Sequence, residues 1–163
     1  MERAQNADPI TVQRAMKAMS GLTTFLDRSG LERSLLELIE IRASQINGCA
    51  YCLDMHTKDA RAGGESEQRI YLLEAWRETS LYNERERAAL AWTEAVTLVA
   101  EGHVLDAVYD EVRHVFTDDE VVALTVAAAT INAWTRINVG LRTIPGTYQP
   151  ATAPIGAAVG NHA

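Results

Sequence analysis

The sequence predicts an all-α protein, a single-domain bundle of about seven helices. Apolar residues recur every three or four positions along most of its 163 residues, which is typical of amphipathic helices. Ser, Asp, Asn or Thr precedes several of these stretches, and Gly or Pro follows them, as is common at helix boundaries. No segment alternates apolar and polar residues convincingly enough to predict a strand.

The first half of the chain is predicted to contain four helices. Asp8 and Pro9 suit the N-cap and the first helical position of the first one, and Ser29-Gly30 ends it. Asn47-Gly48 interrupts or bends the next helical stretch, and Gly63-Gly64 ends the third. A short fourth helix begins at Ser66 or Glu67. The predicted ranges are about 9–28, 31–46, 49–61 and 67–76.

The second half carries two capping-box patterns, Asn83 to Glu86 and Thr117 to Glu120. They predict helices over about 83–102 and over the long apolar run to 141, with another at 105–116 between them. Pro, Gly and Ala dominate from Pro145 onward, a composition that does not sustain a regular helix. We therefore expect a helical domain over 1–145 and an arm or loose tail over 146–163.

Composition excludes several classes of protein. The chain has 15 basic and 22 acidic residues, a net charge of −7, and no basic cluster, so nucleic acid is not an expected partner. Met1 to Asp8 does not resemble a signal peptide, and no apolar run is long enough to span a membrane. Two cysteines do not make a secreted disulfide scaffold, so we expect a cytoplasmic protein with no membrane partner.

Both cysteines lie in one motif, Cys49-Ala-Tyr-Cys52, and His56 follows four residues later. On one helix these three side chains would share a face. A helix N-terminus at Asn47-Gly48 and the imidazole would both favour a thiolate, the nucleophilic form of cysteine. The helix terminus favours Cys49, whereas the imidazole, one turn away, favours Cys52, so local physics leaves the choice of nucleophile open.

This motif allows three interpretations. The cysteines could be small core residues, as free cysteines often are. A zinc site would need four ligands, which Cys49, Cys52, His56 and Glu37 could just supply, but no second ligand pair is present and we expect no metal. A thiol-disulfide centre fits the motif best. Pattern alone favours the surface for the remaining charged candidates: Glu37, Asp54, Lys58, Asp59, His103 and His114.

The run from Glu37 to Arg61 resembles the core of the alkylhydroperoxidase D family, within the carboxymuconolactone decarboxylase superfamily. That family's signature is a Glu, eleven residues, Cys-x-x-Cys, three residues and a His, and every spacing is met here. The stretches 84–95 and 131–142 also resemble the family's later helices, so the resemblance covers about 15–145. It implies an all-helical fold that assembles into homotrimers or homohexamers.

The resemblance also implies roles for the four residues. Cys52 corresponds to the cysteine that attacks peroxide and Cys49 to the one that resolves it, while Glu37 and His56 correspond to the proton relay. Tyr51 stands where the best-studied members have a His, and a Tyr is a poorer proton shuttle at neutral pH. Family members are commonly reduced through a dihydrolipoyl protein, so we expect an external dithiol reductant and no bound cofactor.

We therefore expect a thiol-dependent hydroperoxide reductase. One alternative keeps the fold and replaces the reaction with decarboxylation or ring opening of a lactone, although that chemistry does not need the dithiol. Another is a non-enzymatic redox sensor whose disulfide state alters a partner interface. Turnover separates them, because a sensor would react once and stop.

Overall fold

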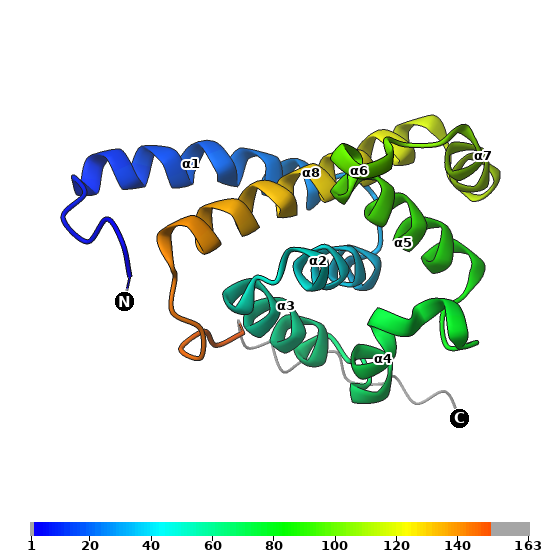
Figure 1. Cartoon of the computed structure of the whole chain (residues 1–163), viewed down its shortest axis with the longest axis horizontal. Helices are drawn as coiled ribbons and strands as arrows, with labels where there is room; N and C mark the ends of the chain where they lie inside the picture. The colour runs from blue at the N-terminus through cyan, green and yellow to red at the C-terminus, as the bar shows by residue number, and fades with distance from the viewer. Residues whose placement is uncertain (1, 151–163) are drawn as a thin grey trace, which may run out of the picture.

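The structure, a computed structural model, describes residues 2–150, and every regular element in that range is a helix (Figure 1). The all-α prediction is therefore confirmed. The rest of the predicted tail, 151–163, lies outside the described residues. In chain order the elements are α1 (Pro9–Leu26), α2 (Arg33–Asn47), α3 (Ala50–Ala62), α4 (Glu67–Leu72), the 3₁₀ helix η1 (Leu73–Glu78), α5 (Glu84–Thr97), α6 (Val99–Gly102), α7 (Asp106–Val115) and α8 (Asp118–Leu141).

The predicted helix starts are confirmed where a capping side chain marks them. Asp8 accepts a hydrogen bond from the backbone N–H of Ile10, and Pro9 is the first residue of α1. Asn83 begins α5 and Thr117 begins α8, each within a complete capping box. Each box satisfies backbone N–H groups that have no partner inside the helix.

Two of the predicted helices are divided. The helix expected over 83–102 ends at Thr97, because the backbone of Leu98 (φ −96°, ψ 24°) leaves the α conformation before α6 begins. The short helix expected over 67–76 continues from α4 into η1, with a kink at Ala75. Neither break carries a Gly or Pro, so the sequence offered no local signal for it.

Helix α2 lies in the middle of the molecule and packs against α3, α5 and α8 (Figure 1). It is buried on nearly all sides between Leu35 and Ser44. Glu37 is buried on this helix together with its apolar neighbours. Because a buried carboxylate is unfavourable unless it is paired, other side chains must compensate the charge of Glu37.

Three apolar clusters fill the interior. The largest joins the end of α1 with α2, α5, α7 and α8, and the second joins α2 and α5 with α3, α4 and η1. The third is small and contains Ala43, Cys49, Cys52 and Ile131, with Tyr51 and Trp134 packed against it. Both cysteines therefore lie where α2, α3 and α8 meet.

The segment after α8 returns along α3. The backbone N–H of Gly146 donates to Asp54 at 2.9 Å, and Lys58 Nζ donates to the carbonyl of Tyr148 at 3.0 Å. The hydroxyl of Tyr148 donates to the Asp59 carboxylate at 2.7 Å. The first residues of the predicted tail are thus held against the helix that carries Cys52 and His56.

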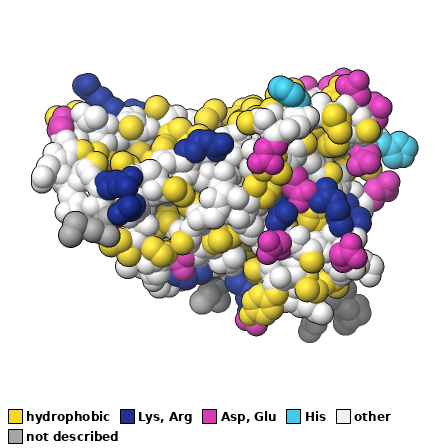
Figure 2. All heavy atoms as spheres, viewed as in Figure 1, with side chains coloured by type: hydrophobic (Ala, Val, Ile, Leu, Met, Phe, Trp, Pro, Cys, Tyr) yellow, Lys and Arg dark blue, Asp and Glu magenta, His cyan; other side chains and the backbone are white. Residues whose placement is uncertain are grey.

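Helix α1 packs mainly on α8, and Leu26 is its only buried residue. Ile10, Leu22 and Phe25 are 41–57% exposed. On the face shown in Figure 2, acidic side chains gather on the right, while apolar atoms and scattered charges cover the left, where α1 and the end of α8 lie. None of the described helices combines the length and the apolar composition that a membrane crossing would take.

Gly48 makes the turn between α2 and α3 in the left-handed conformation, with φ 65° and ψ 33°. A Cβ added there would meet nothing within 4 Å, so the effect of Gly48→Ala isolates backbone strain. We expect the free energy of unfolding in urea to fall by about 1 kcal/mol.

Gly21 supplies the matched control for that substitution. It lies inside α1, where an added Cβ also meets nothing, so Gly21→Ala should raise the free energy of unfolding by about 0.5–1 kcal/mol. Changes of the same sign at the two positions would contradict the assignment of Gly48 to the left-handed turn.

Candidate functional site

The four residues predicted from the sequence are all buried, on two neighbouring helices. Glu37 comes from α2 and is 3% exposed, whereas pattern alone had favoured the surface for it. Cys52 and His56 lie in α3, and Cys49 immediately precedes this helix. The surface position that pattern alone favoured for Glu37 is therefore wrong.

Cys49 and Cys52 are joined by a disulfide, with their Cα atoms 5.4 Å apart. Cys49 is the N-cap of α3 rather than a residue of its first turn, so the predicted common helical face is wrong for this residue. Its Sγ accepts the backbone N–H of Cys52 at 3.3 Å. The helix N-terminus thus faces the sulfur of Cys49, as the sequence suggested.

Cys52 receives a different donor. The side-chain N–H of Asn138, on α8, lies 3.5 Å from Cys52 Sγ. Asn138 was not predicted from the sequence, where its one signal is a polar side chain near the end of a long apolar run. The sulfur of Cys52 therefore has a neutral hydrogen-bond donor, and His56 follows Cys52 by one helical turn on α3.

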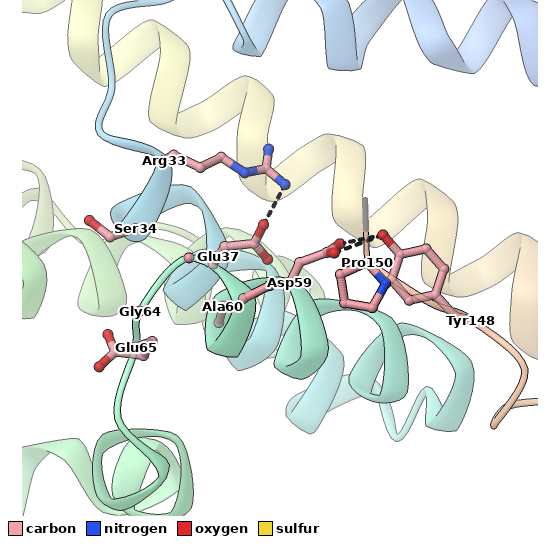
Figure 3. A pocket seen from close by; sticks show the side chains of 11 residues that line it. Arg33, Ser34, Glu37, Asp59, Ala60, Gly64, Glu65, Tyr148 and Pro150 are labelled. Carbon is pink, nitrogen blue, oxygen red and sulfur yellow. Dashed lines mark hydrogen bonds and ion pairs between the residues drawn. The ribbon is translucent and has the colours of Figure 1, made fainter. Parts of the chain in front are cut away.

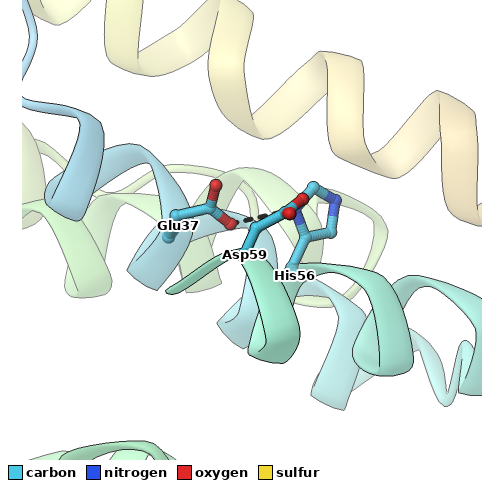
Figure 4. A group of neighbouring side chains, drawn as sticks. All are labelled: Glu37, His56 and Asp59. Atoms are coloured by element: carbon cyan, nitrogen blue, oxygen red, sulfur yellow. Dashed lines mark hydrogen bonds and ion pairs between the residues drawn. The ribbon is translucent and has the colours of Figure 1, made fainter. Parts of the chain in front are cut away.

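His56 reaches across to α2. Its Nδ1 lies 3.1 Å from Glu37 Oε2, and the other oxygen of Glu37 accepts from the Arg33 guanidinium (Figures 3 and 4). The predicted pair of Glu37 and His56 is therefore in direct contact. Arg33, one turn before Glu37 on α2, was not singled out from the sequence.

A second carboxylate lies at the same nitrogen. Glu40 Oε2 is 3.2 Å from His56 Nδ1, an ion-pair distance. Burial lowers the pKa of His56, but hydrogen bonding and the charges of Glu37 and Glu40 outweigh it and raise that pKa to about 9. The imidazole is consequently protonated at neutral pH, and Glu40 is a further site residue that the sequence did not reveal.

Asp59 was expected at the surface, but it lies beside this cluster (Figure 4). It helps to line a pocket of about 620 Å³ together with Arg33, Glu37, Tyr148 and Pro150 (Figure 3). Burial and the hydrogen bond to Asp59 raise the pKa of Tyr148 to about 12, so the phenol stays protonated as a donor. Neither cysteine lines this pocket, so it opens onto Glu37 and Asp59 and not onto the disulfide.

The zinc ligands expected from the sequence are not available as a set in the structure. The zinc hypothesis needed two thiolates, and here the two sulfurs are bonded to each other. Glu37, His56 and Asp59 do place donor atoms within 4.8 Å of one another. Arg33 holds a positive charge against Glu37, which disfavours a cation at this place.

Three aromatic side chains and two histidines lie apart from the hydrogen-bonded cluster. Tyr51 and Trp134 pack beside the cysteines, whereas Trp92 belongs to the largest core cluster and donates to Thr125 at 3.1 Å. His103 and His114 are exposed, as predicted.

Known proteins share this architecture. The protein YdfG of Bacillus subtilis (strain 168), which is uncharacterised, is 44% identical over 126 residues, covering 77% of this chain and 86% of that protein. A crystal structure from Agrobacterium tumefaciens, described as a protein of unknown function and linked to the antioxidant defence protein AhpD, has a TM-score of 0.84 and 43% identity. The match covers 91% of this chain and 100% of that one.

A more distant structure has the same fold. It is an uncharacterised peroxidase-related protein from Ralstonia eutropha JMP134, described as an alkylhydroperoxidase AhpD core, with a TM-score of 0.73 and 20% identity. The match covers 83% of this chain and 72% of that one, and at this identity it supports the fold alone.

The family model that matches this chain is that of the carboxymuconolactone decarboxylase family. It covers residues 11–95, more than half of the chain, and includes both cysteines, His56 and Glu37. Together with the 44% identity to the Bacillus protein, this match shows that the chain belongs to the carboxymuconolactone decarboxylase family.

Proposed function

We propose that this protein reduces hydroperoxides through a cycle in which Cys49 and Cys52 alternate between dithiol and disulfide. The observation that carries the proposal is a Cys-x-x-Cys disulfide on the same helix as a buried, protonated imidazole that two carboxylates hold. The AhpD description of the Agrobacterium relative supports the same reaction class.

In the reduced state, the Cys52 thiolate attacks the distal oxygen of the hydroperoxide. The O–O bond breaks, Cys52 becomes a sulfenic acid, and the alkoxide takes one proton to leave as an alcohol. The Cys49 thiol then displaces hydroxide from the sulfenic acid, which gives the disulfide and, after protonation, one water. An external dithiol reduces the disulfide by thiol exchange and is itself oxidised.

His56 has two tasks in this scheme. As an imidazolium one turn from Cys52, it favours the thiolate form of that cysteine. As an acid, it donates the proton that the departing alkoxide needs. Glu37, hydrogen-bonded to Nδ1 and paired with Arg33, holds the ring in position and supplies negative charge.

The substrate proposed is a hydroperoxide, and the reductant is a dithiol protein or a small dithiol, for which a dihydrolipoyl protein is the first candidate to assay. We propose no resident cofactor. The proposal does not depend on Tyr51, which packs beside the cysteines and takes no part in the proton transfers above.

Steady-state turnover tests the proposed function. The reduced protein should consume many equivalents of hydrogen peroxide or an alkyl hydroperoxide when a dithiol is supplied, and none after its cysteines are alkylated. A single equivalent consumed, followed by arrest in the presence of dithiol, would favour a redox sensor. Release of carbon dioxide from a carboxylated lactone without peroxide consumption would favour the decarboxylase.

We also propose that the protein is a homo-oligomer, a trimer or a hexamer. The support is the exposed apolar face of α1, where Ile10, Leu22 and Phe25 find no cover among the described residues. Sedimentation at micromolar concentration should give a mass of three or six chains. The mass of one chain would contradict this proposal.

A further inference from the structure

Three acidic side chains from two helices gather around His56. Glu37 and Glu40 come from α2, and their Oε2 atoms lie 3.1 and 3.2 Å from the same nitrogen, Nδ1. Asp59 comes from α3 and lies within the same cluster (Figure 4). Only one hydrogen is available at Nδ1, and its direction gives it to Glu37.

The partners of these acids differ. Glu37 accepts from both the Arg33 guanidinium and His56, so both of its oxygens are engaged. Asp59 accepts the Tyr148 hydroxyl on both of its oxygens, at 2.7 and 2.9 Å. Glu40 differs from both, because its Oε2 is buried and has no hydrogen-bond partner among the described residues.

The charges around His56 explain why the unpaired oxygen of Glu40 matters. The negative charge of Glu37 is balanced by Arg33, with which it forms a hydrogen-bonded ion pair. Glu37 therefore divides its charge between Arg33 and His56. Glu40 forms no hydrogen bond or ion pair with a guanidinium among the described residues, so its charge adds to that of Glu37 beside the imidazolium.

We propose that Glu40 is the counter-ion of His56, a positioning residue that acts through the imidazole and keeps it doubly protonated. This inference rests on the proposed function for its chemical meaning, since a doubly protonated His56 is the acid that serves the departing alkoxide. Arg33 and Glu37 then form the support that orients the ring, and Glu40 sets the pH range over which His56 holds its second proton.

The groups that face His56 define the test. They are Glu37 and Glu40 on α2 and Asp59 on α3. Arg33 pairs with Glu37, and Tyr148 donates to Asp59. Cys52 precedes His56 by one turn on α3. Glu40→Gln keeps the shape and removes the charge, and Glu40→Asp keeps the charge on a shorter side chain. Asp59→Asn is the matched control, an equally conservative change to an acid whose oxygens are directed at Tyr148.

The midpoint of His56 is measured by NMR titration of the disulfide form, with the signal assigned by its loss in His56→Ala. The parent should titrate at about pH 9. Glu40→Gln should lower that midpoint by about one pH unit or more, Glu40→Asp should restore much of it, and Asp59→Asn should move it by a few tenths. Circular dichroism spectra of all variants confirm that they are folded.

Two results would overturn the inference: an unchanged midpoint in Glu40→Gln, or an equal fall in Asp59→Asn.

Peroxidase activity provides a separate measurement. Relative to the parent, Glu40→Gln should lose activity several-fold more at about pH 9 than at about pH 7, where both imidazoles are closer to full protonation. A parent protein that consumes no peroxide would refute the proposed function, while the NMR midpoints would still decide whether Glu40 is the counter-ion.

Discussion

Cys52→Ser is expected to abolish reaction with peroxide, whereas Cys49→Ser should be oxidised once and then stop. The two sulfurs differ in their surroundings. Asn138 donates to Cys52, and His56 follows one turn later, whereas Cys49 accepts the backbone N–H of Cys52 at the helix N-terminus. Without Cys49 the sulfenic acid on Cys52 has no thiol to condense with, so excess peroxide should carry it to the sulfinic acid.

Mass spectrometry after one equivalent of peroxide distinguishes the two sulfurs. One oxygen should be added at Cys52 in Cys49→Ser, and Cys49 should be unmodified in Cys52→Ser. The variant lacking both cysteines controls for oxidation of methionine. An oxidised Cys49 in Cys52→Ser, with an unmodified Cys52 in Cys49→Ser, would reverse the assignment and make the helix N-terminus the dominant activator.

Glu37→Gln is expected to lower the rate of peroxide reduction by roughly 10²-fold or more, the usual range for a lost proton-transfer partner. The substitution keeps the side-chain shape but removes the charge that pairs with both Arg33 and His56. Far-ultraviolet circular dichroism should remain that of a helical protein. Glu94→Gln, which removes a charge between Arg42 and Arg77 away from the site, is the control. A parent-like rate in Glu37→Gln would exclude Glu37 from the mechanism.

The raised pKa of His56 should make the free energy of unfolding depend on pH. The pKa of His56 is raised from 6.5 to about 9 in the folded protein, so folding favours the protonated ring. This contribution is fully present below about pH 6.5 and is lost as the pH rises through about 9. Urea unfolding of the disulfide form should show a decline on the order of 3 kcal/mol at most across this window. In His56→Ala the decline should be much smaller.

Local signals were enough to predict the fold class and several helix starts. The capping boxes at Asn83 and Thr117 and the Asp8-Pro9 start depend on neighbours in the sequence, and all three are confirmed. The breaks at Leu98 and Ala75 carry no such signal, because neither a Gly nor a Pro stands at either position. An apolar stripe on a helix is usually buried, but the apolar side chains Ile10, Leu22 and Phe25 of α1 are exposed.

The site also contains residues that a local sequence pattern marks and residues that only the fold brings together. Cys49, Cys52, His56 and Glu37 have fixed spacings within a short run, so the motif could be recognised from the sequence alone. Asn138 reaches Cys52 from a position 86 residues later in the chain, and no local pattern marks it. Glu40 looks like an ordinary surface acid in the sequence, and only the packing of α3 on α2 brings it to His56.

If Cys49 and Cys52 together reduce one hydroperoxide per cycle, a single turnover without a reductant consumes both thiols. The most direct measurement mixes the fully reduced protein with one equivalent of an alkyl hydroperoxide, without dithiol, and follows free thiols, intact mass and alcohol together. We expect loss of both thiols, a mass lower by two hydrogen atoms, a peptide containing the Cys49–Cys52 disulfide, and one equivalent of alcohol. Persistence of both thiols with no alcohol formed would contradict this expectation.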